Sequence, residues 1–395
     1  MNKRVFLIIL DSFGVGEAPD ASAFGDAGSN TLLSISKSKY FKAENLKKLG
    51  LFNIDGIANI PEFKARELEI KPIGAYGKMQ EKSNGKDTTI GHYELAGLIS
   101  NKPFPTYANG FPKSVIDEFE RKIGTKILCN KPYSGTEVIK DYGAEHLKTG
   151  YPIVYTSQDS VFQIACHDGV VPLEKLYNYC EIAREILKGE HAVSRVIARP
   201  FTGEYPFVRT PYRHDYALKP HGTTMLDLLC ENRLQVISIG KIYDIFAGQT
   251  FTKSVKTLSN ADGMEKLKTA VKENFDGLCF ANLVDFDSKY GHRNDIDGYA
   301  NALSEFDDFL GEFLPTLNSE DLLIITADHG CDPSTPSTDH SREYVPLLVY
   351  GEKVVENANL GVRDCFSDVA KTILEYFSIN STKISGTSFL KEILK

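Results

Sequence analysis

Acidic and histidine side chains stand beside several short apolar runs of this chain. They occur in the segments "LIILDSFG", "ANLVDFDSKYGH", "IITADHG" and "STDHSREYVP", which contain Asp11, Asp285, Asp287, His292, Asp328, His329, Asp339 and His340. Carboxylates and imidazoles are the ligands that Mn²⁺ and Zn²⁺ take in proteins. Two such ions held side by side stabilise the entering and leaving oxygens of a phosphoryl transfer. These residues therefore indicate a two-metal site for phosphoryl transfer.

Each of these residues also has a simpler interpretation. A single Asp after a strand is more often a turn residue or a helix cap than a metal ligand. The shared position at the ends of apolar runs is what favours a metal site. Asp285 and Asp339 are the weaker members, because each neighbours a better candidate. Both are open to a role as a cap or as a partner of a ligand.

A candidate nucleophile stands in the segment "NGKDTTIGHYE", which has two hydroxyls, Thr88 and Thr89, after a Lys-Asp pair. A hydroxyl that attacks phosphorus must lose its proton easily, and a nearby metal ion favours that loss. Taken alone, the segment favours a simpler structure in which Asp87 or Thr88 caps the turn into the residues that follow. The spacing does not choose between the two hydroxyls.

The apolar runs must form neighbouring strands if they are to bring these groups together. Their hydrophobicity is continuous rather than alternating, which is typical of parallel strands covered on both faces. The runs are Val5–Leu10, Val236–Gly240, Leu278–Val284, Leu322–Thr326 and Val345–Tyr350. Apolar residues at steps of three and four predict a helix from Ile296 to Phe313, capped by Asp295, and a second helix is expected over Ser367–Phe377. We therefore expect a doubly wound α/β core with a mostly parallel sheet, whose ligands bind at the carboxyl ends of the strands.

The middle of the chain has a different pattern of turn residues and apolar runs. Turn-rich segments such as "NKPFPTYANGFPK" and "RPFTGEYPFVRTPYRHD" surround three strand-like stretches, Ile153–Thr156, Val161–Cys166 and Arg195–Ala198. This pattern predicts a smaller α+β domain inserted into the core. The expected division is residues 1–99 and 220–395 for the core and 100–219 for the inserted domain.

Composition narrows the classes of partner. The net charge of -8 over 395 residues, without a long Lys/Arg run, argues against a nucleic-acid binder. The seven scattered cysteines include no C-x-x-C pair, which argues against a disulfide framework or a thiolate zinc site. The first apolar run is too short for a membrane span and lacks a signal-peptide cleavage site. We expect a soluble cytoplasmic protein whose partners are small molecules and cations, and no obligate protein partner is evident.

Longer motifs carry a family resemblance. "LDSFGVGEAPDA", "NGKDTTIGHYE", "LVDFDSKYGHRND" and "TADHGCDPSTPSTDHSREYVPLLVY", with "RVIARPF", "RHDYALKP" and "IGKIYDIFAG", resemble the bacterial phosphopentomutases of the alkaline phosphatase superfamily over nearly the whole chain. The resemblance implies an isomerase that interconverts ribose 1-phosphate and ribose 5-phosphate, and the deoxyribose pair, in nucleoside salvage. Where many members carry Trp after the Gly-His of the second motif, this chain has Tyr93, which keeps an aromatic side chain there.

The resemblance also implies roles for individual residues. Two Mn²⁺ ions would be held, one by Asp287, His292 and His340 and the other by Asp11, Asp328 and His329. The family's Asp-x-x-x-x-His spacing selects Asp287 over Asp285. The residue after Lys-Asp, Thr88, would carry the phosphoryl group and ligate the second metal. A sugar bisphosphate such as glucose 1,6-bisphosphate would prime that threonine.

Candidate substrate residues lie mostly in the predicted insert. Arg binds phosphate in a bidentate manner and Lys acts as a mobile charge, so Arg195 with Lys241 is a plausible pair for a sugar phosphate. The resemblance implies a sugar-phosphate pocket lined by the residues matching Asp159, Arg195, Ile197 and Lys241. The full candidate set is Ser157, Asp159, Arg195, Ile197, Arg209 and Lys241. Arg209 has an alternative role as a structural partner of Asp215.

Three other functions compete with the isomerase. A cofactor-independent phosphoglycerate mutase would share the metal-bearing core but uses a serine nucleophile and a different insert. A metal-dependent phosphohydrolase would release inorganic phosphate. A non-enzymatic binding protein would use the metals only to hold its fold. An isomerase must also keep water from the phosphothreonine, and the inserted domain is expected to act as a lid for that purpose.

Overall fold

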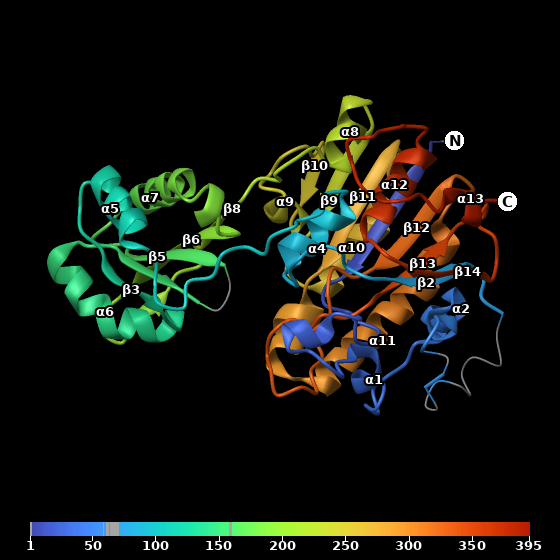
Figure 1. Cartoon of the computed structure of the whole chain (residues 1–395), viewed down its shortest axis with the longest axis horizontal. Helices are drawn as coiled ribbons and strands as arrows, with labels where there is room; N and C mark the ends of the chain where they lie inside the picture. Colours follow the sequence, from blue (N-terminus) through green and yellow to red (C-terminus); the bar gives the residue numbers. More distant parts are fainter. Residues whose placement is uncertain (1, 58, 61–62, 64–70, 158–159) are drawn as a thin grey trace. The chain divides into compact units, whose positions relative to one another are not determined.

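The computed structural model of the chain describes residues 2–57, 59–60, 63, 71–157 and 160–395. The chain divides into two compact units, shown in Figure 1. The larger unit consists of Met1–Lys102 and Pro220–Lys395, and the smaller unit is Pro103–Lys219. Each unit is described by itself below.

The larger unit is built on a mixed sheet whose middle strands are parallel. In the described residues its strand order is β10-β9-β11-β1-β12-β13-β2-β14. The parallel strands are β1 (Arg4–Leu10), β9 (Gln235–Ile239), β10 (Lys253–Val255), β11 (Gly277–Leu283) and β12 (Asp321–Thr326). Every residue of β1 is buried, because the strand has a neighbour on each side and is covered on both faces. The apolar runs in these segments therefore form strands as expected.

The other side of this sheet departs from parallel order. β13 (Val345–Tyr350) is antiparallel to both β12 and β2 (Ala75–Met79), and β14 (Ala358–Arg363) runs parallel to β2. The continuous apolar run of β13 thus belongs to an antiparallel strand that is buried on both faces. Periodicity alone does not separate the two cases. The sheet as a whole remains mostly parallel, as predicted.

Helices of this unit pack in two groups. One group contains α4 (Thr88–Leu95), α8 (Met225–Glu231) and α12 (Ser367–Tyr376), and the other contains α1 (Thr31–Ile35), α2 (Glu44–Leu49), α10 (Asn260–Ala270) and α11 (Ile296–Phe313). The short helices α9 (Ile242–Ile245) and α13 (Leu390–Ile393) complete the unit. The side chain of Asp295 accepts the N–H of Gly298, which confirms the predicted cap of α11. The unit is a doubly wound α/β fold.

The smaller unit has an α+β fold with its own sheet. Its described strands are β3 (Leu128–Pro132), β4 (Ile153–Thr156), β5 (Val161–His167), β6 (Arg195–Thr202), β7 (Val208–Arg209) and β8 (His214–Ala217). Its helices are α5 (Lys113–Ile123), α6 (Gly135–Thr149) and α7 (Leu173–Ile186). Apolar clusters on the sheet give this unit a core of its own. The predicted strand-like stretches correspond to β4, β5 and β6.

Membrane-spanning helices and disulfide bonds were considered for the part of the chain that the structure describes. Within the described ranges, no helix combines the length and the apolar character that crossing a membrane requires. All seven cysteines are described and are free thiols.

Candidate active site

Three neighbouring strands bring their carboxyl ends to one edge of the larger sheet. β1 lies between β11 and β12, with Leu10 opposite Leu283 and Ile9 opposite Thr326. Asp11 follows β1 directly, and Asp328 comes just after the end of β12. Asp287 lies in the short helix η4 (Phe286–Tyr290) that follows β11. The parallel register therefore gathers carboxylates that are far apart in the sequence.

The first group at this edge contains Asp11, Asp328 and His329. Nε2 of His329 lies 3.4 Å from Oδ1 of Asp11 and 3.2 Å from Oδ2 of Asp328. All three residues are buried, with Asp11 and Asp328 completely shielded from solvent. The strand ends thus place two carboxylates and one imidazole around a single point.

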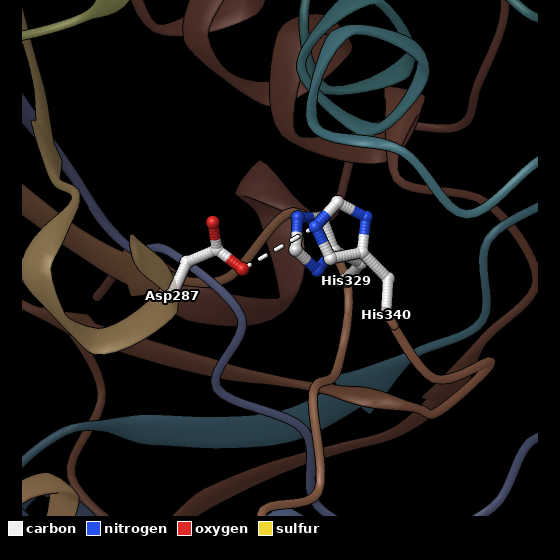
Figure 2. A group of neighbouring side chains, drawn as sticks. All are labelled: Asp287, His329 and His340. Atoms are coloured by element: carbon white, nitrogen blue, oxygen red, sulfur yellow. Dashed lines mark ion pairs between the residues drawn. The ribbon is translucent and has the colours of Figure 1, made fainter. Parts of the chain in front are cut away.

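The second group contains Asp287, His292 and His340. Nε2 of His340 lies 3.3 Å from Oδ1 of Asp287, the ion pair drawn in Figure 2, and Nε2 of His292 lies 3.4 Å from Oδ2 of the same carboxylate. The ring of His329 stacks on that of His340 with centroids 3.9 Å apart, so the two groups adjoin. The six residues that the resemblance assigned to metal are thus brought together.

Asp285 and Asp339 lie outside both groups. Oδ2 of Asp285 accepts the N–H of Asn260 at 2.8 Å, at the start of α10, and bonds Nζ of Lys289 at 2.9 Å. Asp339 accepts the N–H of His340 at 2.9 Å and pairs with Lys86 at 3.5 Å. Asp285 thus exchanges hydrogen bonds with Asn260, the first residue of α10, whose N-cap is Ser259. The partners of Asp339 fit a residue that supports a ligand.

In His292, His329 and His340, Nδ1 of the ring lies next to a backbone carbonyl oxygen. Nδ1 of His329 lies 3.0 Å from the carbonyl oxygen of Gly330, and Nδ1 of His340 lies 2.9 Å from that of Lys86. Nδ1 of His292 lies 2.6 Å from the carbonyl oxygen of Thr338. A ring that donates Nδ1–H to a carbonyl keeps the lone pair of Nε2 for a metal ion. All three Nε2 atoms face the carboxylates, so the rings are set for cation binding.

The electrostatics of the cluster favour ionised carboxylates. Burial raises the pKa of Asp328, but the neighbouring His329 and His92 rings outweigh burial and lower that pKa well below its usual range. The pKa of Asp287 is likewise held well below its usual range by its histidine neighbours, against the effect of burial. Burial lowers the pKa of His329, and the carboxylates of Asp328 and Asp11 raise it well above its usual value. The carboxylates are therefore in the form that binds cations.

Three buried carboxylate oxygens in this cluster accept no well-directed hydrogen bond from the described residues, although each lies 3.1–3.4 Å from a histidine nitrogen. They are Oδ1 of Asp11, Oδ1 of Asp287 and Oδ2 of Asp328. A buried anionic oxygen without a partner is costly unless a cation compensates its charge. Each of these carboxylates belongs to a group whose ligand atoms lie within 4.8 Å of one another. The donor set therefore fits divalent cations.

Thr88 is the first residue of α4 and lies against the cluster. Its hydroxyl oxygen is 3.2 Å from Nε2 of His329. Oδ1 of Asp87 accepts the N–H groups of Thr89 and Ile90 at 3.0 and 3.2 Å, so Asp87 is the predicted helix cap and the Thr88 hydroxyl is not used for capping. A side chain at Gly91 would meet the carbonyl oxygen of Asp328 at 2.1 Å, so the glycine lets α4 approach the metal cluster.

The candidate substrate residues are divided between the units. Arg195 and Ile197 lie in β6, Arg209 in β7 and Ser157 just after β4, all in the smaller unit. Lys241 lies in the larger unit, at the start of α9. Asp159 is outside the described residues.

The alternative role of Arg209, as a structural partner of Asp215, is not seen among the described contacts. Asp215 instead accepts Nε and Nη2 of Arg213 at 2.7 Å each, and Nη1 of Arg195 at 3.5 Å. Strand pairing explains the difference, because β8 places Asp215 directly opposite Ile197 on β6, whereas Arg209 pairs with Phe201 further along that strand. Sequence proximity did not reveal this register.

Arg199 joins these arginines and was missed by sequence reasoning. Its Nε donates to Oε1 of Gln163 at 3.1 Å. Burial, together with nearby Arg213 and Arg209, lowers its pKa to about 10. Several arginines of the smaller unit therefore lie near one another. In the sequence, the segments "RVIARPF" and "RHDYALKP" contain Arg195, Arg199 and Arg213 but do not show that these side chains are neighbours.

Comparisons with known proteins show the family of the chain. Residues 3–381 match the family model described as the metalloenzyme superfamily. The chain is 59% identical over 394 residues to the phosphopentomutase of Lachnoclostridium phytofermentans, covering 100% of both proteins. It is 55% identical over 390 residues to the phosphopentomutase of Thermotoga maritima, covering 98% of each.

Among solved structures, a phosphoglycerate mutase of Leishmania mexicana aligns with 98% of this chain and 97% of its own, at a TM-score of 0.50 and 11% identity. This likeness concerns the fold alone, because the identity is so low. The full-length relatives named as phosphopentomutases are far closer in sequence. The chain therefore belongs to the phosphopentomutase family of isomerases, within the metalloenzyme superfamily.

Proposed function

We propose that this isomerase interconverts ribose 1-phosphate and ribose 5-phosphate, and the corresponding deoxyribose phosphates. The observation that carries the proposal is the position of Thr88, whose hydroxyl lies 3.2 Å from His329 within a buried carboxylate and imidazole cluster. Membership of the phosphopentomutase family supplies the substrate class. The substrates are small sugar phosphates, and neither a nucleic acid nor a membrane is involved.

Two Mn²⁺ ions would occupy the cluster. Asp287, His292 and His340 would hold one, and Asp11, Asp328 and His329 would hold the other together with Thr88. Bound there, the ions would offset the charge on the phosphoryl group and favour loss of a proton from the attacking hydroxyl. The unpartnered oxygens of Asp11, Asp287 and Asp328 support this assignment.

In the proposed reaction the active enzyme carries phosphate on Thr88. The C1 hydroxyl oxygen of ribose 5-phosphate attacks phosphorus, the bond from phosphorus to the Thr88 oxygen breaks, and the hydroxyl proton is transferred overall to that oxygen. The product of this step is ribose 1,5-bisphosphate. The Thr88 hydroxyl then attacks the 5-phosphate, the bond to O5 breaks and O5 gains the proton. Ribose 1-phosphate leaves, and the phosphothreonine is restored.

The start of α4 favours phosphate on Thr88. A helix N-terminus stabilises negative charge through the helix dipole. Asp87 holds the N–H groups of Thr89 and Ile90 and fixes the first turn, so the Thr88 side chain keeps one direction relative to His329. A resting enzyme without phosphate would be primed by glucose 1,6-bisphosphate or a similar sugar bisphosphate.

We assign sugar-phosphate recognition to Ser157, Asp159, Arg195, Ile197 and Arg209, with Lys241 from the larger unit. The positive charge of Arg195, Arg199 and Arg209 supports an anionic ligand. Among the described residues Asp215 bonds Arg195 and Arg213 but neither Arg199 nor Arg209. The smaller unit, Pro103–Lys219, would serve as a cap domain that keeps water from the phosphothreonine.

One assay tests this function against its rivals. Purified protein is incubated with Mn²⁺, ribose 5-phosphate and a trace of glucose 1,6-bisphosphate, and phosphorus NMR follows the products. Ribose 1-phosphate is the expected product. Release of inorganic phosphate alone would identify a phosphohydrolase. Turnover of 3-phosphoglycerate in a parallel incubation, without turnover of ribose 5-phosphate, would identify a phosphoglycerate mutase. Bound metal without turnover would identify a binding protein.

A further inference from the structure

Asn282 is a buried amide at the end of β11 that contacts the metal cluster. Its Nδ2 donates to Oδ2 of Asp11 at 2.9 Å. The same Nδ2 lies 3.3 Å from Nε2 of His92. The two hydrogens of one amide group therefore serve one carboxylate and one imidazole.

His92 lies in the first turns of α4 and is completely buried. Its Nδ1 is 2.8 Å from the carbonyl oxygen of Thr88 and 3.1 Å from Oδ2 of Asp328. A proton on Nδ1 satisfies the Thr88 carbonyl and leaves Nε2 as the acceptor for Asn282. One chain of hydrogen bonds thus runs from the Thr88 peptide through His92 and Asn282 to Asp11.

The amide orientation of Asn282 is determined by its two acceptors. Reversing the amide would place Oδ1 2.9 Å from the Asp11 carboxylate oxygen, where the two oxygens repel each other. In the observed orientation Oδ1 is buried without a hydrogen-bond partner among the described residues. Leaving a buried carbonyl unsatisfied has a free-energy cost. The orientation is therefore maintained for the two bonds that Nδ2 makes.

We propose that Asn282 and His92 are positioning residues that couple the Asp11 carboxylate to the peptide of the nucleophile. Asn282 fixes the rotamer of Asp11 so that its Oδ1 faces His329 at 3.4 Å, within the group that also contains Asp328. His92 links the same chain to the Thr88 carbonyl and so relates the position of the hydroxyl to that of the carboxylate. This inference rests on the proposed roles of Thr88 and Asp11.

A matched control exists in the smaller unit. His146 is also completely buried, its Nδ1 lies 2.7 Å from the carbonyl oxygen of Tyr151, and its Nε2 accepts the N–H of His167 at 2.9 Å. It makes the same pair of contacts as His92 but lies in the unit that does not contain the metal cluster. His146→Gln therefore reports the cost of losing a buried, doubly bonded imidazole.

Calorimetric titration of the chelator-treated full chain with Mn²⁺ alone tests the proposal. For Asn282→Ala we expect one of two binding events to weaken by about 10- to 100-fold, the usual effect of removing a residue that orients a ligand. His92→Gln retains an acceptor near Nε2 but loses the donor to Thr88, so Mn²⁺ binding should stay near that of the parent while kcat falls. His92→Asn retains the donor near Nδ1 but loses the acceptor, so Mn²⁺ binding should weaken. The KM for ribose 5-phosphate should change less than twofold in all three.

Unchanged Mn²⁺ binding in a folded Asn282→Ala variant would overturn the proposal. So would His92→Gln and His92→Asn variants that bind Mn²⁺ equally well. If one of the three variants does not fold, Mn²⁺ binding by the other two still tests the proposal. The loss of thermal stability in His92→Gln is compared with that in His146→Gln. A parent protein without isomerase activity would contradict the proposed function, whereas the titration would still test the hydrogen-bond chain.

Discussion

The hydroxyl oxygen of Thr88 lies 3.2 Å from Nε2 of His329, and this same nitrogen lies 3.4 Å from Asp11 and 3.2 Å from Asp328. One imidazole nitrogen therefore faces the hydroxyl and both carboxylates of its group. The arrangement places the proposed nucleophile at the edge of the proposed metal site. It arises because α4 begins where the parallel strands β1 and β12 end.

Replacement of Thr88 tests its role as nucleophile. Thr88→Ala should lower the isomerase rate by about a thousandfold or more, because it removes the α4 hydroxyl that contacts His329. Intact-mass spectrometry after incubation with glucose 1,6-bisphosphate should show one added phosphoryl group in the parent and none in the variant. Thr89→Ala is the matched control and should retain most activity. Substantial isomerase activity in Thr88→Ala would contradict the assignment, provided that its metal content is normal.

Asp285 and Asp287 form a natural pair for testing the metal ligands. Asp287→Asn should weaken the binding of one of the two proposed metal ions, because Oδ1 of Asp287 is buried without a well-directed hydrogen bond and faces His340. Asp285→Asn should leave metal content unchanged and lower the unfolding free energy by about 1 kcal/mol, the usual net value of one hydrogen bond. Inductively coupled plasma analysis after dialysis measures the metal content. Equal metal loss in both variants would show that the cluster responds to any local change.

The strands that carry the site were predictable because they are buried on both faces. A short, continuous apolar run between turn residues is typical of such a strand. The direction of β13 was not predictable from its composition, because a central antiparallel strand is as apolar as a parallel one. The division into units shows the same limit. Composition suggested boundaries after residues 99 and 219, and the compact units divide after Lys102 and Lys219.

The site was predictable where a residue type carries its own chemistry at a strand end. Asp11, Asp328 and His329 could be identified in this way. His92 and Asn282 could not, because a histidine on a helix and an asparagine in an apolar strand have many ordinary uses. Their contacts with Thr88 and Asp11 depend on side-chain directions that only the folded chain defines. The choice of Asp287 over Asp285 came from the family motif, and the strand geometry gives the physical difference between them.

Arg342 is expected to hold the loop before Thr88. Its Nη1 bonds Oε2 of Glu81 at 2.6 Å and the carbonyl oxygen of Gly85, and its Nε pairs with Asp20 at 3.2 Å. Arg342→Leu leaves the Glu81 carboxylate buried without its cation, so we expect a loss of about 3–5 kcal/mol in unfolding free energy and a lower kcat. Denaturant titration and steady-state kinetics measure these effects.

The control for Arg342→Leu is an exposed ion pair in the same unit. Lys353 pairs with Glu320 at the surface. Lys353→Ala should change the unfolding free energy by less than about 1 kcal/mol and leave kcat unchanged. An Arg342→Leu variant as stable as Lys353→Ala would show that the buried pair does not hold the loop.

Lys241 is expected to act on the sugar phosphate rather than on phosphoryl transfer to Thr88. Lys241→Ala should raise the KM for ribose 5-phosphate about tenfold or more, because one charge-assisted contact to phosphate is lost. The variant should still gain one phosphoryl group when it is incubated with glucose 1,6-bisphosphate, as measured by intact-mass spectrometry. Lys253→Ala, which removes an exposed lysine paired with Glu273, serves as the control. Unchanged kinetics in Lys241→Ala would remove this lysine from the substrate site.

Metal removal should destabilise the larger unit. The unpartnered oxygens of Asp11, Asp287 and Asp328 are tolerated when cations compensate their charge, and mutual repulsion of these carboxylates increases when the cations are removed. A ligand present at about 100 times its Kd stabilises the folded state by about 2.7 kcal/mol, so chelation should lower the Tm by about 5 °C or more. Differential scanning calorimetry with and without a chelator measures the shift. In Asp328→Asn the shift should be smaller, because one buried charge is absent and the site binds its cation weakly. Identical transitions in the parent with and without chelator would show that no cation compensates these carboxylates.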